Sequence, residues 1–142
     1  MNIKPCTILD LPDIYRVLYE NLGESDNLHS RTRNALVEGL NVYFLENDKL
    51  IIFDYIGQEK YIVHIHSVSR DSRGKGLRDF AVRASRWMID NRKAVCFLNF
   101  VDNNRLDLKI FMRMVGSKKI GDIPGTNQTL YVSAEGMGIR ED

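Results

Sequence analysis

The sequence predicts a single mixed α/β domain, and three observations support that class. The chain has 142 residues, which is the ordinary size of one domain with one core. Hydrophobic residues make up 44% of it and charged residues 27%, as in a typical globular protein. Apolar residues recur with helical spacing in some segments and alternate as in strands in others. The expected order of elements is β-α-α-β-β-β-α-β-α-β-β.

The first 40 residues predict one strand and two helices. Asp10 caps the first helix, because its carboxylate can accept from the free amides of the first turn, where Pro12 is also tolerated. The apolar face of this helix consists of Ile14, Val17, Leu18 and Leu22. The expected elements are a strand over 2–6, a helix ending at Gly23, a polar loop over 24–30 and a weaker helix over 32–40.

After residue 40 the apolar spacing becomes that of strands. The expected strands cover 41–46, 50–55, 60–69, 94–101, 118–123 and 129–133. The expected helices cover 77–90 and 104–115. Asn47-Asp48-Lys49 is a hairpin turn between the first two of these strands. In the third strand, alternation places Tyr61, Val63, Ile65 and Ser67 on one face, and Ile62, His64, His66 and Val68 on the other.

Several features of the chain exclude whole classes of protein. The expected domain covers residues 1–134, and residues 135–142 are expected to form a frayed tail. No apolar run approaches the roughly 18 residues that span a bilayer, and the N-terminus lacks the pattern of a signal peptide. Cys6 and Cys96 are too few for a disulfide framework and have no metal-type spacing. Reduced thiols in a cytoplasm fit them best.

The net charge of +1 argues against a nucleic-acid binder that acts through bulk charge. The charge is nevertheless uneven along the chain. Residues 70–93 hold eight basic and three acidic side chains, a local excess of five positive charges. This segment predicts a basic patch suited to a phosphorylated ligand.

A glycine-rich turn opens the basic segment and is its most informative part. Its sequence is Val68-Ser-Arg-Asp-Ser-Arg73-Gly-Lys-Gly76-Leu-Arg78. Gly74 and Gly76 let the backbone approach a ligand and the next helix adds its dipole, so the turn suits a phosphate or pyrophosphate. A tight turn with solvated arginines explains the same spacing. The P-loop pattern of Gly, four residues and then Gly-Lys-Ser/Thr does not occur here, and the dinucleotide fingerprint is not met because Asp79 stands in place of its third glycine.

The arrangement as a whole resembles the GNAT superfamily of N-acetyltransferases. In that family a strand ends Val-x-Pro-x-x-Arg-Gly-x-Gly and leads into a long helix; here Arg70 replaces the proline. The opening Ile3-Lys4-Pro5-Cys6-Thr7 is similar to the family's first strand, and Phe111-Met112-Arg113-Met114-Val115-Gly116 to its last helix. The resemblance implies one mixed, mostly antiparallel central sheet flanked by helices. No metal is expected, because no third ligand with suitable spacing accompanies His64 and His66.

The resemblance also implies acetyl-CoA as the cofactor. The family motif Gln/Arg-x-x-Gly-x-Gly/Ala is met in part, since Asp71 or Arg78 breaks it in each alignment. The implied pyrophosphate site is Arg73, Gly74, Lys75, Gly76, Leu77 and Arg78, with the pantetheine arm pairing at Val68. Arg78 would either crowd that site or contact a phosphate. Asn103 and Asn104 stand where the family often has an asparagine near the cofactor, with Asn104 the expected contact, and both are also plausible helix caps.

His64 and His66 are the expected catalytic residues. Their side chains titrate near neutrality, so either can take a proton from an amine, directly or through water. Members similar to serotonin N-acetyltransferase carry a His-x-His pair on this strand two residues earlier, which makes His64 the better match and His66 the weaker. Two structural histidines in a half-buried strand are the alternative. A zinc site would need a third ligand of suitable spacing.

The general acid is the element that the sequence does not supply. Met112 stands where the family often has a tyrosine that protonates the leaving thiolate, and Ser117 follows Gly116 in place of phenylalanine. Tyr131, Cys96 or water would have to substitute.

Leu98-Asn99-Phe100-Val101 and the last helix are also similar to short acetyltransferase-like proteins of tailed phages, some of which are associated with virion assembly.

Two functions therefore stand side by side. The first is an N-acetyltransferase that moves an acetyl group from acetyl-CoA to a primary amine by direct attack in a ternary complex. The second is a catalytically silent GNAT-fold protein that binds a partner or belongs to a phage virion. The expected acceptor is an amine of a small molecule or of a protein. A second copy of the chain, forming a homodimer, is a further expected partner. No membrane is expected, and the expected compartment is a cytoplasm, or a host cytoplasm or virion for a phage protein.

Overall fold

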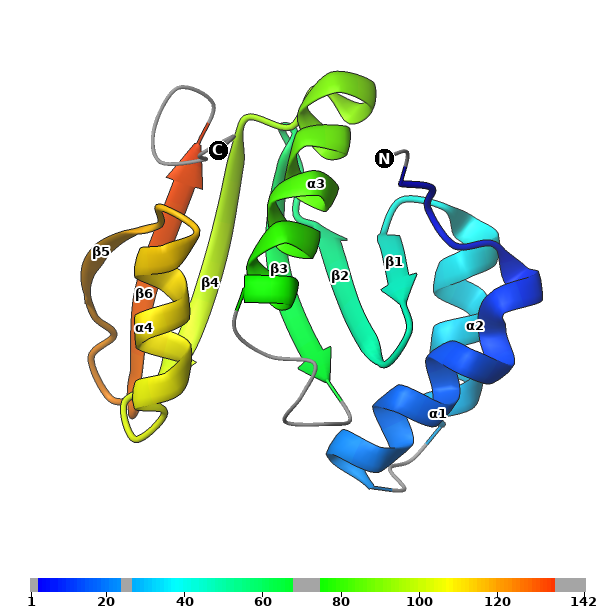
Figure 1. Ribbon diagram of the computed structural model, residues 1–142, viewed down its shortest axis with the longest axis horizontal. Helices are drawn as coiled ribbons and strands as arrows, with labels where there is room; N and C mark the ends of the chain where they lie inside the picture. The colour runs from blue at the N-terminus through cyan, green and yellow to red at the C-terminus, as the bar shows by residue number, and fades with distance from the viewer. Residues whose placement is uncertain (1–2, 24–26, 68–74, 135–142) are drawn as a thin grey trace.

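A single six-stranded sheet forms the centre of the computed structural model, which describes residues 3–23, 27–67 and 75–134 (Figure 1). The strands are β1 (Val42–Glu46), β2 (Lys49–Tyr55), β3 (Lys60–Ser67), β4 (Cys96–Asp102), β5 (Lys118–Asp122) and β6 (Gln128–Ala134). Their order across the sheet is β1-β2-β3-β4-β6-β5, and only β3 and β4 run parallel. The predicted mixed, mostly antiparallel architecture is confirmed.

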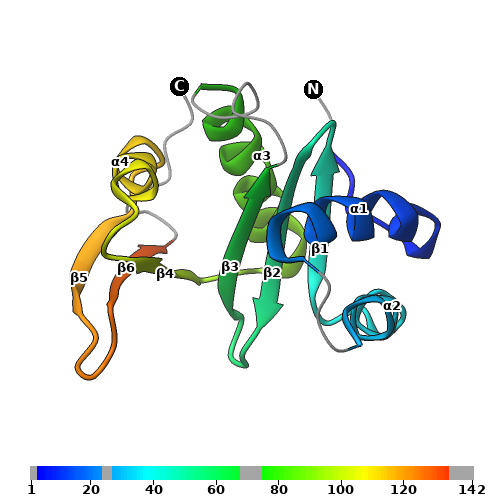
Figure 2. The same ribbon diagram turned by 90° about the horizontal axis from the view of Figure 1, so that it is seen from below.

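Helices cover both faces of this sheet. They are α1 (Leu11–Leu22), α2 (Leu28–Glu38), α3 (Lys75–Arg92) and α4 (Leu106–Met114). α3 and α4 lie on one face, and α1 and α2 on the other (Figure 2). In the part of the chain that the structure describes, none of these helices is long and apolar enough to cross a membrane.

The larger core cluster lies between the sheet and α3. The helix expected over 77–90 is confirmed, and it buries one apolar face that consists of Leu77, Phe80, Ala81, Ala84 and Met88. Opposite them, Phe53 packs on Phe97 with ring centroids 5.3 Å apart. Trp87 packs edge-on against Phe44, so this ring belongs to the margin of the core. At the edge of the helix, Arg83 binds Glu46 of β1 at 2.8 Å.

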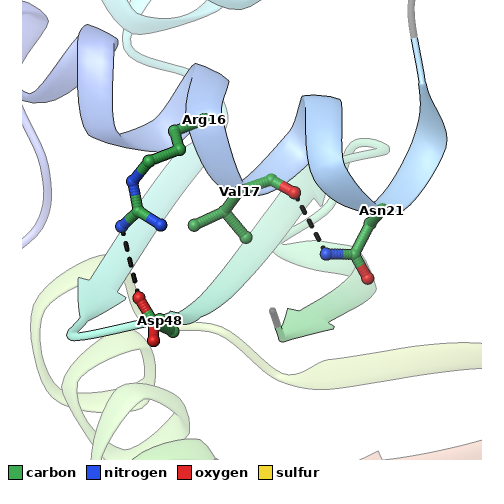
Figure 3. Close-up of polar contacts among 4 residues, drawn as sticks. All are labelled: Arg16, Val17, Asn21 and Asp48. Atoms are coloured by element: carbon green, nitrogen blue, oxygen red, sulfur yellow. Dashed lines mark hydrogen bonds and ion pairs between the residues drawn. The ribbon is translucent and has the colours of Figure 1, made fainter. Parts of the chain in front are cut away.

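The smaller core cluster lies under α1 and α2. Ile14, Val17 and Leu18 are buried there as predicted, whereas Leu22 at the end of α1 is 55% exposed. Arg16 reaches the β1–β2 turn and pairs with Asp48 at 3.3 Å (Figure 3). The turn itself contains only two residues, because Glu46 already pairs with Lys49. Gly23 ends α1 as predicted, with a positive φ of 70° that glycine adopts without steric cost.

Three expectations for the N-terminal segment are wrong. In its described part, residues 3–6, no strand forms; the Cys6 amide makes a single bond to the Tyr43 carbonyl, and Pro5 has no amide to donate. Asp10 does not cap α1 with its side chain; its carboxylate accepts from the Thr7 amide and caps a short 3₁₀ turn, Ile8–Asp10. α2 begins at Leu28, earlier than the predicted residue 32.

β3 and β4 are paired over only part of their length. The parallel pairs are Lys60 with Cys96, Tyr61 with Phe97, and Ile62 with Leu98. Beyond these pairs β3 continues beside β2 as far as Ser67, and β4 continues beside β6 as far as Asp102. The two strands therefore diverge toward their carboxyl ends (Figure 1). This divergence opens the centre of the sheet.

Candidate functional site

Two cavities occupy the opening between the diverging strands. The first, here called the split cavity, has a volume of about 150 Å³ and lies between β3 and β4 beside α4. The second, the mouth cavity, has a volume of about 440 Å³ and lies among the ends of α1 and β3, the start of α3, and α4. Ile65 and His66 line both. A ligand can therefore reach the centre of the sheet from its open end.

His64 lines the split cavity and has a carboxylate beside it. Its Nε2 lies 2.7 Å from Oδ2 of Asp54 on β2. In the register of the two strands His64 pairs with Ile52 and Asp54 with Ile62, so the contact between them runs diagonally on one face. Sequence reasoning selected His64 but missed Asp54. The signal was available in the β2–β3 hairpin, whose short connection fixes which residues share a face.

His66 lies on the same face, as predicted, but in a different environment. Burial, and then the charge of His64, lower the pKa of His66 from 6.5 to about 4. The imidazole of His66 is therefore neutral at neutral pH and holds a proton only weakly. It lines both cavities, whereas His64 lines the split cavity. The predicted pair is thus brought together at the opening, with His64 paired to a carboxylate and His66 half-buried.

The start of α3 faces the mouth cavity through Leu77, which is buried. Gly76 is exposed in the first turn, and a Cβ added there would lie 3.7 Å from Nζ of Lys49. Lys49, which sequence reasoning missed, also pairs with Glu46 at 3.6 Å. It places a positive charge beside the amino end of α3, where the helix dipole already favours an anion. The predicted residues Val68, Arg73 and Gly74 lie outside the described residues, and Lys75 begins the helix.

Arg78 points from the first turn of α3 to the end of α4. Its Nε donates to the Met114 carbonyl at 3.1 Å, and its Nη1 lies 3.6 Å from Asp79. A guanidinium at the carboxyl end of a helix is favourable, because the last carbonyls carry partial negative charge. The structure thus gives Arg78 a bridging contact between two helices, a role that neither sequence alternative included.

Met112 closes the inner side of the split cavity. It is 2% exposed, and it also borders a third cavity of about 30 Å³. That small cavity is lined by the hydroxyls of Ser117 and Ser133, which lie 3.3 Å apart, and by buried Asn99. Its volume is sufficient for a water molecule with several polar partners. By contrast, Tyr131 is buried within the larger core cluster.

The asparagines before α4 do not cap it. Arg105 occupies the cap position and makes no side-chain cap bond. Asn103 instead contacts the hydroxyl of Thr129 on β6 through its side-chain oxygen, and Asn104 is exposed in the turn. Arg105 and Asp107 form a two-bonded ion pair at the rim of the mouth cavity.

Neither cysteine forms a disulfide. Burial, and then the charge of Asp10, raise the pKa of the Cys6 thiol to about 12. Such a thiol is protonated and unreactive at neutral pH. Cys96 lies in β4 near the closed end of the opening, where the strands are still paired. Among the residues that the structure describes, no three His, Cys, Asp or Glu side chains group as metal ligands would.

Sequence comparisons and structure comparisons give different results for this chain. No protein-family model matches it, and no curated protein matches its sequence. A GNAT-family acetyltransferase from Bacillus cereus has a similar structure, with a TM-score of 0.72 and 14% identity over 94% of this chain and 96% of that one. A ribosomal-protein-S5-alanine acetyltransferase from Vibrio fischeri gives 0.73 and 14% over 93% and 91%.

A third similar structure holds a ligand. It is the spermidine N-acetyltransferase from Vibrio cholerae in complex with CoA and spermine, with a TM-score of 0.72 and 13% identity over 96% of each chain. All three likenesses extend over nearly the whole of this chain. They show that it has the GNAT fold, as the glycine-rich turn and the order of elements predicted.

Proposed function

We propose that this protein is an N-acetyltransferase that moves an acetyl group from acetyl-CoA to a primary amine. The observation that carries the proposal is the parting of β3 and β4 beside the start of α3, with His64 and His66 on the lining of the opening. The GNAT fold of the chain and the CoA held by one structural neighbour support it. Fold alone does not define chemistry, and it is these side chains that indicate proton transfer to a histidine.

Acyl transfer to an amine requires three things. The amine must lose its proton, the developing oxyanion needs a hydrogen-bond donor, and the leaving thiolate needs a proton. In the proposed reaction the amine nitrogen attacks the thioester carbonyl directly. A C–N bond forms, the C–S bond breaks, the amine proton passes to a histidine of the opening, and water supplies the proton of the thiolate, since Met112 has none to give.

The residues that would hold the acyl donor lie at the start of α3. Gly76 leaves room in front of the first turn, and Lys49 adds a positive charge to that of the helix end. Leu77 and Ile65 supply apolar contacts in the mouth cavity for the pantetheine arm. Arg73, Gly74 and Lys75 are proposed to complete the phosphate site, with Val68 pairing with the arm.

Isothermal titration calorimetry with acetyl-CoA tests the proposal. We expect saturable binding by the unaltered chain and its loss in Gly76→Trp, because the indole would stand where the phosphates must lie. Gly76→Ala is the matched control, since its Cβ makes only an ordinary contact with Lys49. Absence of binding at high micromolar acetyl-CoA, or full binding by Gly76→Trp, would contradict the assignment.

The second candidate is a catalytically silent GNAT-fold protein that binds a partner or belongs to a phage virion. It is favoured by Met112, which cannot donate a proton, and by Arg78, whose guanidinium is bound to α4. A turnover assay with a panel of amines, including spermidine and a peptide with amino-terminal alanine, separates the two. Release of CoA that is lost in His64→Ala would reject the silent alternative.

A further inference from the structure

We propose that Asp54 is a positioning residue that acts through His64, and that the two form a carboxylate–imidazole dyad in the opening. The inference rests on the proposed function, since it assigns the proton acceptor of that reaction. Its basis is the contact of 2.7 Å between His64 Nε2 and Asp54 Oδ2. The carboxylate is joined to the backbone of β2 and the imidazole to that of β3, and the sheet fixes both.

The contact determines which ring nitrogen is free. An ionised carboxylate can only accept a hydrogen bond, so the proton between the two groups belongs to Nε2 of His64. The neutral imidazole then carries its lone pair on Nδ1, and that nitrogen is the one left to accept the proton of the amine. The imidazolium formed in this step would be stabilised by the adjacent carboxylate.

A titratable side chain on a neighbouring strand also lies near Asp54. Tyr43 on β1 lies on the same face, and its pKa is raised to about 12, first by burial and then by the charge of Asp54. Arg31 on α2 acts on Tyr43 in the opposite sense. His66 on β3 is the remaining neighbour of His64, and its neutral ring adds no charge.

The same geometry separates the roles of the two histidines. His66 is half-buried and has a pKa of about 4, so it is a poor acceptor for the proton of an ammonium group. His64 is 45% exposed and its partner Asp54 37%, so a proton taken up by His64 can pass on to solvent. We therefore assign proton uptake to His64 and a lining role to His66.

A competing role for Asp54 is direct binding of a cationic acceptor. The two roles predict different results in a double-mutant cycle of Asp54→Ala, His64→Ala and the double variant, measured as kcat and KM for both substrates. If Asp54 acts through His64, we expect Asp54→Ala to lower kcat about tenfold or more and His64→Ala about 100-fold. The double variant should then be no slower than His64→Ala.

Two results would overturn the inference. The first is additive losses in the cycle, and the second is a rise in KM for the amine that persists when His64 is absent. Asp48→Ala is the matched control, because Asp48 also pairs with a basic side chain, Arg16 of α1, but lies in the β1–β2 turn, outside the two cavities. Its turnover should equal that of the unaltered chain.

Proton NMR provides a readout independent of activity. The His64 Nε2 proton should give a downfield resonance in the unaltered chain and lose it in Asp54→Ala, with other amide signals retained as evidence of folding. Absence of that resonance in the unaltered chain would overturn the pairing. Absence of turnover by the unaltered chain would overturn the proposed function and the catalytic role of Asp54 together, whereas turnover with an additive cycle would overturn the role of Asp54 alone.

Discussion

His64 and His66 stand two positions apart on one strand, and the sheet gives them different chemistry. Their shared face follows from the alternation of a strand and was predicted from the sequence. The difference comes from neighbours that are remote in the chain: Asp54 from β2 approaches the ring of His64, while the ring of His66 is partly buried. The type of a residue and the face of the strand on which it lies are local properties. The desolvation of its side chain depends on how the elements pack.

Burial of His66 predicts a loss of stability in mild acid. Its pKa is about 4 when folded and near 6.5 when unfolded, so between these values the unfolded chain binds a proton that the folded chain does not. Stability contributed by neutral His66 is present above pH 6.5 and is lost as the pH falls toward 4. The loss is at most about 3 kcal/mol.

Urea denaturation of the unaltered chain and of His66→Gln over this pH range measures the effect. The free energy of unfolding should fall more steeply with acidity in the unaltered chain than in the variant, since glutamine does not titrate. His29→Gln is the control, because His29 is exposed on α2, and it should keep the steep dependence. Equal slopes for the unaltered chain and His66→Gln would show that His66 is protonated in the folded state.

At the scale of elements, helix α3 was the most predictable part of the chain. Its buried positions follow from a helical repeat over 18 residues, which leaves little freedom in choosing the apolar face. The N-terminal expectations were wrong where local signals competed. Asp10 suits a helix cap, but a 3₁₀ turn before α1 uses its carboxylate, and a single bond to β1 is too little to form a strand.

The contact of Arg78 with α4 predicts that this arginine couples two helices. Replacing it by methionine keeps the aliphatic stem and removes the donor to the Met114 carbonyl. We expect Arg78→Met to lower the free energy of unfolding by about 1.5–3 kcal/mol, the range for hydrogen bonds with a charged partner. Thermal or urea denaturation measures it.

Arg113→Met serves as the comparison for Arg78→Met. Arg113 is exposed in the last turn of α4, so its replacement should cost less than about 0.5 kcal/mol. Equal stabilities of the two variants would refute the bridging role. Calorimetry on Arg78→Met also shows whether Arg78 contributes to acetyl-CoA binding, because a phosphate contact would weaken binding in addition to the loss of stability.

At the scale of the whole molecule, the sheet consists of two antiparallel halves joined by a short parallel contact. Three residue pairs connect β3 to β4, and α3 covers the joint. Phe97 lies at this joint, 2% exposed, with its ring packed against Phe53 and Tyr61 of the other half. The opening that holds the candidate site therefore depends on a narrow, well-packed junction.

Phe97→Ala is expected to weaken the junction strongly. Removal of a buried phenylalanine costs about 3–5 kcal/mol, through lost transfer free energy and the cavity left behind. Phe100→Ala is the matched control on the same strand, because Phe100 is 39% exposed and should cost much less. Urea denaturation followed by tryptophan fluorescence measures both. A similar cost for the two variants would mean that the junction does not hold the halves together.

The sequence by itself determined the class of fold, the faces of the longer elements and the place of the glycine-rich turn. These depend on the periodicity of apolar residues and on short motif spacings, which involve residues that are close together in the sequence. Only the tertiary structure decided that β3 and β4 part after Ile62 and Leu98, that Lys49 stands before α3, and that Asp54 meets His64. Each of these joins residues from different elements, so distance and burial, which fix their chemistry, arise only when the sheet is assembled.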